Sequence, residues 1–75
     1  MKNNKIYRSI GEVAKEILVN THTLRFWEKT FSQIKPKFFN SKRRYYDQKT
    51  IDILRRIQFL LKEEGMTIKG VKKLL

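Results

Sequence analysis

Three consecutive cations, Lys42, Arg43 and Arg44, are the sharpest chemical feature of this sequence. Ammonium and guanidinium groups bind phosphate oxygens, and three cations in a row repel one another unless an anion lies close to them. Lys35 and Lys37 precede the run and add to the same basic patch. Such a run is most often a solvated surface, but here we favour contact with the phosphates of a nucleic acid.

A second group of polar side chains opens a short helix that we predict at residues 21–29. Thr21, His22 and Thr23 occupy its first turn, from which side chains reach base edges when a helix enters the major groove of DNA. The competing role for Thr21 is to cap the helix, alone or with Asn20. His22 has no metal-binding or catalytic partner nearby in the sequence, so we interpret it as a base or phosphate contact.

Arg25 follows on the same predicted helix. It can reach DNA or pair with Glu28, three residues further along. We favour DNA contact, with the Glu28 carboxylate orienting the Arg25 guanidinium. Trp27 lies three residues after Leu24 on the apolar side of the helix, and we therefore interpret it as a core residue rather than a stacking platform.

The overall charge agrees with an anionic partner. The chain has 75 residues, with 18 Lys and Arg against 7 Asp and Glu, and a formal net charge of +11. Nucleic acid is the commonest partner of so basic a chain, although a membrane surface or an acidic protein is compatible with charge alone. No apolar stretch reaches the roughly 18 residues that cross a bilayer. The default location is therefore the cytosol, and we expect no membrane partner.

The residue types argue against catalysis and against cofactors. The chain has no cysteine and one histidine, which excludes disulfides and thiolate metal sites and makes a structural zinc site improbable. Neither a carboxylate pair nor a pairing of a nucleophile with a base is visible. We therefore expect a binding domain that is not an enzyme and needs no cofactor or metal.

Two short helices are expected to position the polar side chains. Ser9 and Glu12 form a capping-box pattern that begins the first helix, which should end near Leu18. The second helix starts about three residues later, and this arrangement is typical of a helix-turn-helix. Counting from Ile10, the positions where the helices cross carry the small or apolar residues that close packing requires. These are Ala14, Val19, Leu24 and Trp27.

A hairpin is expected to follow the second helix. The aromatic pairs Phe38-Phe39 and Tyr45-Tyr46 flank a polar stretch, which predicts two short strands joined by a turn with Asn40 as the residue that tolerates positive φ. Alternation along a strand turns one aromatic residue of each pair toward the core, so only one face is left for DNA.

The rest of the chain predicts two more helices. Asp47 can cap a third helix that ends at Gly65, and Thr67 can cap a fourth. Phe59 falls on the polar side of the third helix, and we interpret it as a contact to a partner segment. The chain ends in an apolar helix, so we expect one domain of a longer protein. The predicted divisions of the domain at 1–75 are a basic arm (1–8), a helix-turn-helix (9–29), a wing (30–46) and a helical pair (47–75).

From about Tyr7 to Leu75, the chain resembles the MerR family of bacterial transcription regulators. The resemblance is carried by an ordered set of motifs rather than by any one of them. The motifs are Ile10-Gly11-Glu12-Val13-Ala14, Thr23-Leu24-Arg25-Phe26-Trp27-Glu28, Lys35-Pro36, Arg44-Tyr45-Tyr46, Leu54 to Gly65, Met66-Thr67-Ile68 and Val71-Lys72-Lys73-Leu74. Three departures from the family pattern occur: Leu18 stands where the turn usually has Gly, Lys42 where the wing often has Gly, and Phe26 where Tyr is frequent.

The resemblance implies a mainly α-helical winged helix-turn-helix of four short helices and a two-stranded hairpin wing. It implies sequence-specific binding to double-stranded promoter or operator DNA in the cytoplasm, at the bacterial nucleoid. It also implies a homodimer formed through a C-terminal helix after Leu75, with RNA polymerase as a further partner to consider. An RNA-binding or basic protein-interaction module is the alternative. The DNA contacts that we predict are Thr21, His22, Thr23, Arg25, Phe26, Lys42, Arg43, Arg44 and Tyr46.

Overall fold

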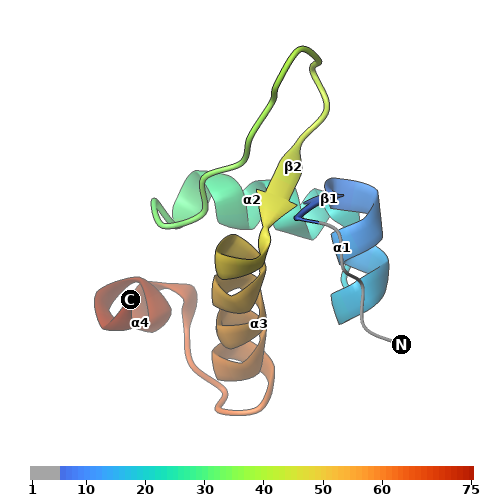
Figure 1. The fold of residues 1–75 in the computed structure, drawn as a ribbon. Coiled ribbons are helices and arrows are strands. Elements are labelled where there is room, and N and C mark those ends of the chain that lie inside the picture. The colour runs from blue at the N-terminus through green and yellow to red at the C-terminus, as the bar shows by residue number, and fades with distance from the viewer. Residues whose placement is uncertain (1–5) are drawn as a thin grey trace.

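The computed structural model describes residues 6–75, and Figure 1 shows their arrangement. Within this range four helices and two short strands follow one another in the order β1-α1-α2-β2-α3-α4. A long loop between α2 and β2 projects away from the helical body, and α4 lies beside α3 (Figure 1). The elements are β1 (Tyr7–Ser9), α1 (Ile10–Ile17), α2 (Thr21–Thr30), β2 (Tyr45–Asp47), α3 (Gln48–Lys62) and α4 (Ile68–Leu74). The predicted fold class, a mainly helical winged helix-turn-helix, is confirmed.

The predicted capping box begins α1. The amide of Glu12 donates to the Ser9 hydroxyl at 3.2 Å, and the amide of Ser9 donates to the Glu12 carboxylate at 2.9 Å. The helix ends where predicted, because Leu18 adopts a left-handed conformation with φ 60°. This turns the chain so that the amide of Val19 donates to the Ala14 carbonyl at 3.1 Å. Leu18 therefore adopts the left-handed conformation that ends a helix, which glycine adopts without steric cost.

Replacing Leu18 with Gly is expected to leave the free energy of unfolding unchanged or to raise it by up to about 1 kcal/mol. A left-handed conformation costs a residue with a Cβ roughly 1–2 kcal/mol, whereas glycine adopts it freely at the expense of unfolded-state entropy. Little packing is removed, because Leu18 is 81% exposed. Thermal melts of Leu18→Gly and of the control Leu18→Ala, which keeps the Cβ, measure the difference. A marked loss of stability in the glycine variant alone would contradict this account of the turn.

The two strands join the start of the described chain to its middle. β1 pairs with β2 in antiparallel register, with Arg8 opposite Tyr46, and the amide of Ile10 extends the ladder by donating to the Arg44 carbonyl at 3.1 Å. The predicted basic arm is therefore wrong for Tyr7 and Arg8, which belong to a strand, while residues 1–5 lie outside the described range.

Burial of Arg8 explains why β1 is held in place. The side chain is only 2% exposed, and its guanidinium donates to the Gln48 side chain. It also lies 3.4 Å from the Glu16 carboxylate, which pairs with Arg55 as well. A charge that lies inside a protein needs such partners. Arg8 therefore links β1 to α1 and to the start of α3.

The wing is a hairpin, but its pairing differs from the prediction. Lys37 and Tyr45 form a single antiparallel bridge, with backbone hydrogen bonds of 2.8 and 2.9 Å. The amide of Ser41 donates to the Phe38 carbonyl at 3.0 Å and closes the turn. Positive φ occurs at Phe39 (47°) rather than at Asn40, so that part of the prediction is wrong.

Aromatic contacts explain the unusual backbone of Phe39. Its ring meets Tyr7 edge to face at 4.9 Å between centroids, and it meets Tyr45 in the same way at 5.7 Å. Each such pair contributes roughly 0.5–1.5 kcal/mol beyond the area it buries. These contacts connect the base of the wing to β1 and β2.

The core lies where the apolar faces of the helices meet β2. Leu24 and Trp27 enter it from α2, and the stripe predicted on the third helix enters it from α3. Its buried hydrophobic members are Val13, Ala14, Ile17, Leu24, Trp27, Phe31, Ile34, Tyr46, Ile51, Leu54, Ile57, Leu60 and Val71. Trp27 is thus a core residue, as predicted.

The N-cap of α3 is expected to make stability depend on pH. The Asp47 carboxylate accepts from the amide of Thr50 at 2.9 Å, and this bond lowers the pKa of Asp47 below its ordinary value. Asp47→Ala should therefore lower the free energy of unfolding by about 0.5–2 kcal/mol at pH 7. Since the folded-state pKa is depressed, the ionic part of this stabilisation is present above the unfolded-state pKa and is lost as the pH falls through the folded value.

Melts between pH 7 and pH 2 measure this effect, with Asp47→Asn as the matched control. Asparagine keeps the capping oxygen but cannot titrate, so this variant should resemble the parent at pH 7 and lose less stability on acidification. Equal acid sensitivity of the parent and Asp47→Asn would contradict the assignment.

Candidate nucleic-acid interface

One face of α2 is open to solvent and carries three of the nine residues predicted to contact DNA. His22, Arg25, Phe26 and Lys29 are exposed and together line a shallow depression of about 260 Å³. Phe26 is 51% exposed and is the large apolar side chain of this face. The buried side chains of α2 point to the core instead, so the helix divides into a packed face and a free face, as the spacing predicts.

The N-cap of α2 determines which side chains of its first turn are available to a ligand. The Asn20 side-chain oxygen accepts from the amide of Thr23 at 2.8 Å and from its hydroxyl at 3.0 Å. Asn20 is therefore the N-cap, and Thr21 is the first helical residue. Because the Thr23 hydroxyl already serves the cap, His22 is the side chain in this turn that is most exposed to a ligand.

The three wing cations lie in two different environments. Lys42 and Arg43 are exposed in the loop, where the Arg43 amide donates to the Ser41 hydroxyl at 3.2 Å. Arg44 is half-buried at the base of the wing, and its Nε donates to both carboxylate oxygens of Glu28, at 3.0 and 2.9 Å. The wing is thus tied to α2 by an ion pair.

This ion pair corrects the role predicted for Glu28. The predicted partner of Glu28 is Arg25, three residues before it, but the carboxylate binds Arg44 instead. A spacing of three residues along a helix allows an ion pair within that helix. The spacing does not tell whether the carboxylate instead binds a cation from another element. The Arg44 partner is 16 residues away, and no local pattern in the sequence indicates it.

Tyr46 does not belong to the exposed surface, which corrects another prediction. Its side chain is fully buried, and its hydroxyl donates to Glu28 at 3.4 Å. Burial, followed by the negative charge of Glu28, raises the pKa of Tyr46, so the hydroxyl stays protonated and remains a donor. Tyr46 cannot touch a nucleic acid in this structure. Its neighbour Tyr45 is the more accessible member of the pair.

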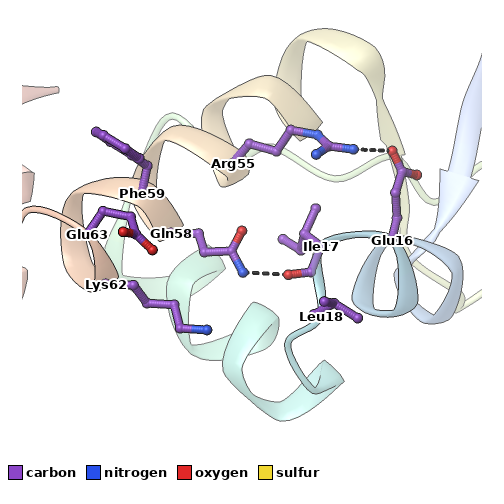
Figure 2. A pocket seen from close by; sticks show the side chains of 8 residues that line it. All are labelled: Glu16, Ile17, Leu18, Arg55, Gln58, Phe59, Lys62 and Glu63. Carbon is purple, nitrogen blue, oxygen red and sulfur yellow. Dashed lines mark hydrogen bonds and ion pairs between the residues drawn. The ribbon is translucent and has the colours of Figure 1, made fainter.

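A separate cavity of about 400 Å³ lies between the end of α1 and the exposed side of α3 (Figure 2). The exposed apolar side chains of Leu18 and Phe59 line it. Gln58 donates to the Ile17 carbonyl across it. None of the residues predicted to contact DNA lines this cavity, and a partner segment at Phe59 remains a prediction. Its lining residues are Glu16, Ile17, Leu18, Arg55, Gln58, Phe59, Lys62 and Glu63.

The described part of the chain offers few alternatives to this surface. Within residues 6–75, no three His, Cys, Asp or Glu side chains gather closely enough to bind a metal ion. The helices in the same range are too short or too polar to span a lipid bilayer.

Comparison with known proteins gives one match. A family model described as "MerR HTH family regulatory protein" matches residues 8–75, which is nearly the whole chain. No curated protein and no solved structure is significantly similar to the chain.

Proposed function

The chain belongs to the MerR family of helix-turn-helix regulatory proteins, and from this membership we propose that it is the sequence-specific, double-stranded DNA-binding domain of a bacterial transcription regulator. Members of this family bind DNA to regulate transcription and are not enzymes. The observation that carries the proposal is the free face of α2, where His22, Arg25, Phe26 and Lys29 are all exposed on one side of the helix.

The proposed docking places α2 in the major groove. His22, at the exposed start of the helix, reads base edges together with Thr21 and Arg25, while the Thr23 hydroxyl mainly donates to the Asn20 cap. Phe26 supplies an apolar surface for a thymine methyl group or a sugar, which are the contacts that apolar side chains make with DNA. A phenol at this position would add a hydrogen bond to phosphate, which Phe26 cannot make.

The wing is proposed to lie along the DNA backbone. Lys42 and Arg43 are exposed cations without an ion pair to any residue in the range 6–75. A phosphate that binds them therefore displaces water and breaks no ion pair within this range. Contacts of this kind supply affinity and register rather than sequence preference. Arg44 is proposed to join them from the base of the wing.

Further parts of the proposal follow from the family's mode of action. We expect the full-length regulator to act as a homodimer on two half-sites, to affect RNA polymerase at a promoter and to reside at the bacterial nucleoid. Two linked domains gain affinity by effective concentration, so a single domain should bind DNA weakly. Tests of DNA binding are therefore best made with the chain fused to a dimerising helix.

A binding-site selection from a random pool of duplexes tests the function. The dimeric fusion should enrich one sequence and should prefer it over random duplex at 150 mM salt by a factor on the order of 10³ or more. Structured RNA and anionic vesicles serve as competitors in the same assay. Equal or stronger binding to RNA, without enrichment of any duplex, would replace the proposal with the RNA-binding alternative.

A further inference from the structure

We propose that Glu28, although acidic and adjacent to the DNA-binding face, strengthens DNA binding by positioning Arg44 for a backbone phosphate. This inference rests on the proposed function and deepens it. It assigns Glu28 as a positioning residue that joins the recognition helix to the wing, so that the two elements meet DNA as one rigid unit.

The hydrogen bonds of Arg44 leave its phosphate-binding side free. Both Glu28 oxygens lie within 3.0 Å of the single Nε atom. Neither Nη group has a hydrogen-bond partner among residues 6–75. An arginine held through Nε still offers the four N–H donors of its two Nη groups, which form the fork that fits phosphate.

Two further contacts, and the position of Glu28 next to a buried residue, restrict how Arg44 and Glu28 can move. The Arg44 Cζ atom lies 5.7 Å from the centre of the Phe38 ring, which supports the guanidinium from the wing. The Tyr46 hydroxyl donates to Glu28 at 3.4 Å and comes from the core. Glu28 itself follows the buried Trp27 on α2. Glu28 is therefore attached to the packed core, and the Arg44 guanidinium lies against Phe38, which is itself 42% exposed.

Partial burial makes this pair more persistent than an ordinary surface ion pair. The Arg44 and Glu28 side chains are only 27% and 13% exposed. Ion pairs between fully exposed side chains contribute little, because water screens them and both side chains lose freedom. Here that freedom is already limited by the surrounding contacts, so binding a phosphate requires less further ordering of Arg44.

The proposal and simple electrostatics predict opposite changes in DNA affinity when the charge of Glu28 is removed. Removing a negative charge from a DNA-binding surface should by itself tighten binding, because phosphates repel carboxylates. If Glu28 positions Arg44, then Glu28→Gln should weaken binding instead, since the amide holds the guanidinium less firmly. In a protein that already lacks the guanidinium, the same change should no longer weaken binding.

The experiment measures the Kd of dimeric fusions on the selected duplex and on random duplex at several salt concentrations. We expect Glu28→Gln to weaken binding about threefold to tenfold, which is the lower part of the range expected when one pairwise interaction is removed. Arg44→Ala should weaken binding to both duplexes and lower the salt slope by about one unit for each phosphate that is no longer bound. In the Arg44→Ala background, Glu28→Gln should leave Kd unchanged or lower it.

Two further variants serve as controls. Glu64→Gln removes the same charge from an exposed site beyond the end of α3 and should tighten binding slightly or leave it unchanged. Arg44→Lys keeps the charge but replaces the fork with one ammonium group, which Glu28 would bind directly, so its Kd should approach that of Arg44→Ala. Melting curves check that each variant is folded, and Arg44→Lys decides the question if Glu28→Gln does not fold.

The outcomes separate this inference from the proposed function. If the parent protein binds duplex DNA and Glu28→Gln tightens binding as Glu64→Gln does, Glu28 is only a repulsive charge and the inference is overturned. Parent-like binding by Arg44→Lys overturns it as well, because Arg44 then acts as a point charge. If the parent protein prefers no duplex, the proposed function itself fails.

Discussion

Replacing Trp27 with Ala should lower the free energy of unfolding by about 3–5 kcal/mol, the usual effect of truncating a large buried aromatic residue. Trp27 is buried on the inner face of α2, where it joins the core with Leu24. A domain of this size has a total stability of roughly 4–11 kcal/mol at 0.05–0.15 kcal/mol per residue. The loss is a large part of this total, so the variant should melt at a markedly lower temperature, and DNA binding should be lost wherever the variant unfolds.

Urea denaturation followed by circular dichroism measures this change, because the chain has one tryptophan and the variant loses its fluorescence signal. Phe26→Ala is the matched control from the adjacent, exposed face of the same helix. It should alter stability by about 0.5 kcal/mol or less, as surface substitutions usually do. Comparable losses from both variants would show that α2 does not divide into a packed face and a free face.

Replacing His22 with Ala should cost roughly 1–3 kcal/mol of binding free energy on the preferred DNA site and little on random duplex. His22 is exposed in the first turn of α2, and Asn20 rather than His22 caps the helix. Its removal should therefore leave the fold unchanged. A contact to a base edge displaces no counterion from a phosphate, so the slope of log Kd against log salt should also stay the same.

Arg43→Ala is the contrasting variant in the same titration. Arg43 is exposed in the wing loop, and its removal should weaken binding to both duplexes by a similar factor and lower the salt slope by about one unit. If His22→Ala weakens both duplexes equally, α2 only docks on the backbone, and sequence preference must come from Arg25 or from distortion of the DNA. If Arg43→Ala has no effect, the wing tip does not touch DNA.

The helices can be predicted from the sequence because their signals are local. Ser9, Asn20, Asp47 and Thr67 each cap a helix at the predicted place, and every cap involves an amide only three residues away. The periodic apolar residues then identify the inner face of each helix. The same reasoning places Trp27 in the core and leaves His22 on the surface.

The features that the sequence does not predict depend on contacts between distant segments. The three-residue strands β1 and β2 are too short to produce an alternating pattern, so the sequence places Arg8 in an arm rather than in the sheet. The burial of Tyr46 and its contact with Glu28 follow from the tertiary fold, which brings the Tyr46 hydroxyl to a carboxylate 18 residues away in the sequence. Contacts between distant residues depend on tertiary packing, and residue spacing alone is compatible with several different partners for each residue.

The partnership between β1 and the start of α3 has a consequence for synthesis on the ribosome. Arg8 hydrogen-bonds to Gln48, which is 40 residues further along the chain. At about 5–20 residues per second, Gln48 is therefore added to the chain about 2–8 s after Arg8. Helices form within about a microsecond, so α1 can form and dissolve many times in this interval. Until Gln48 has been added, Arg8 lacks one of its two side-chain partners within residues 6–75, and the sheet that supports the wing is completed late.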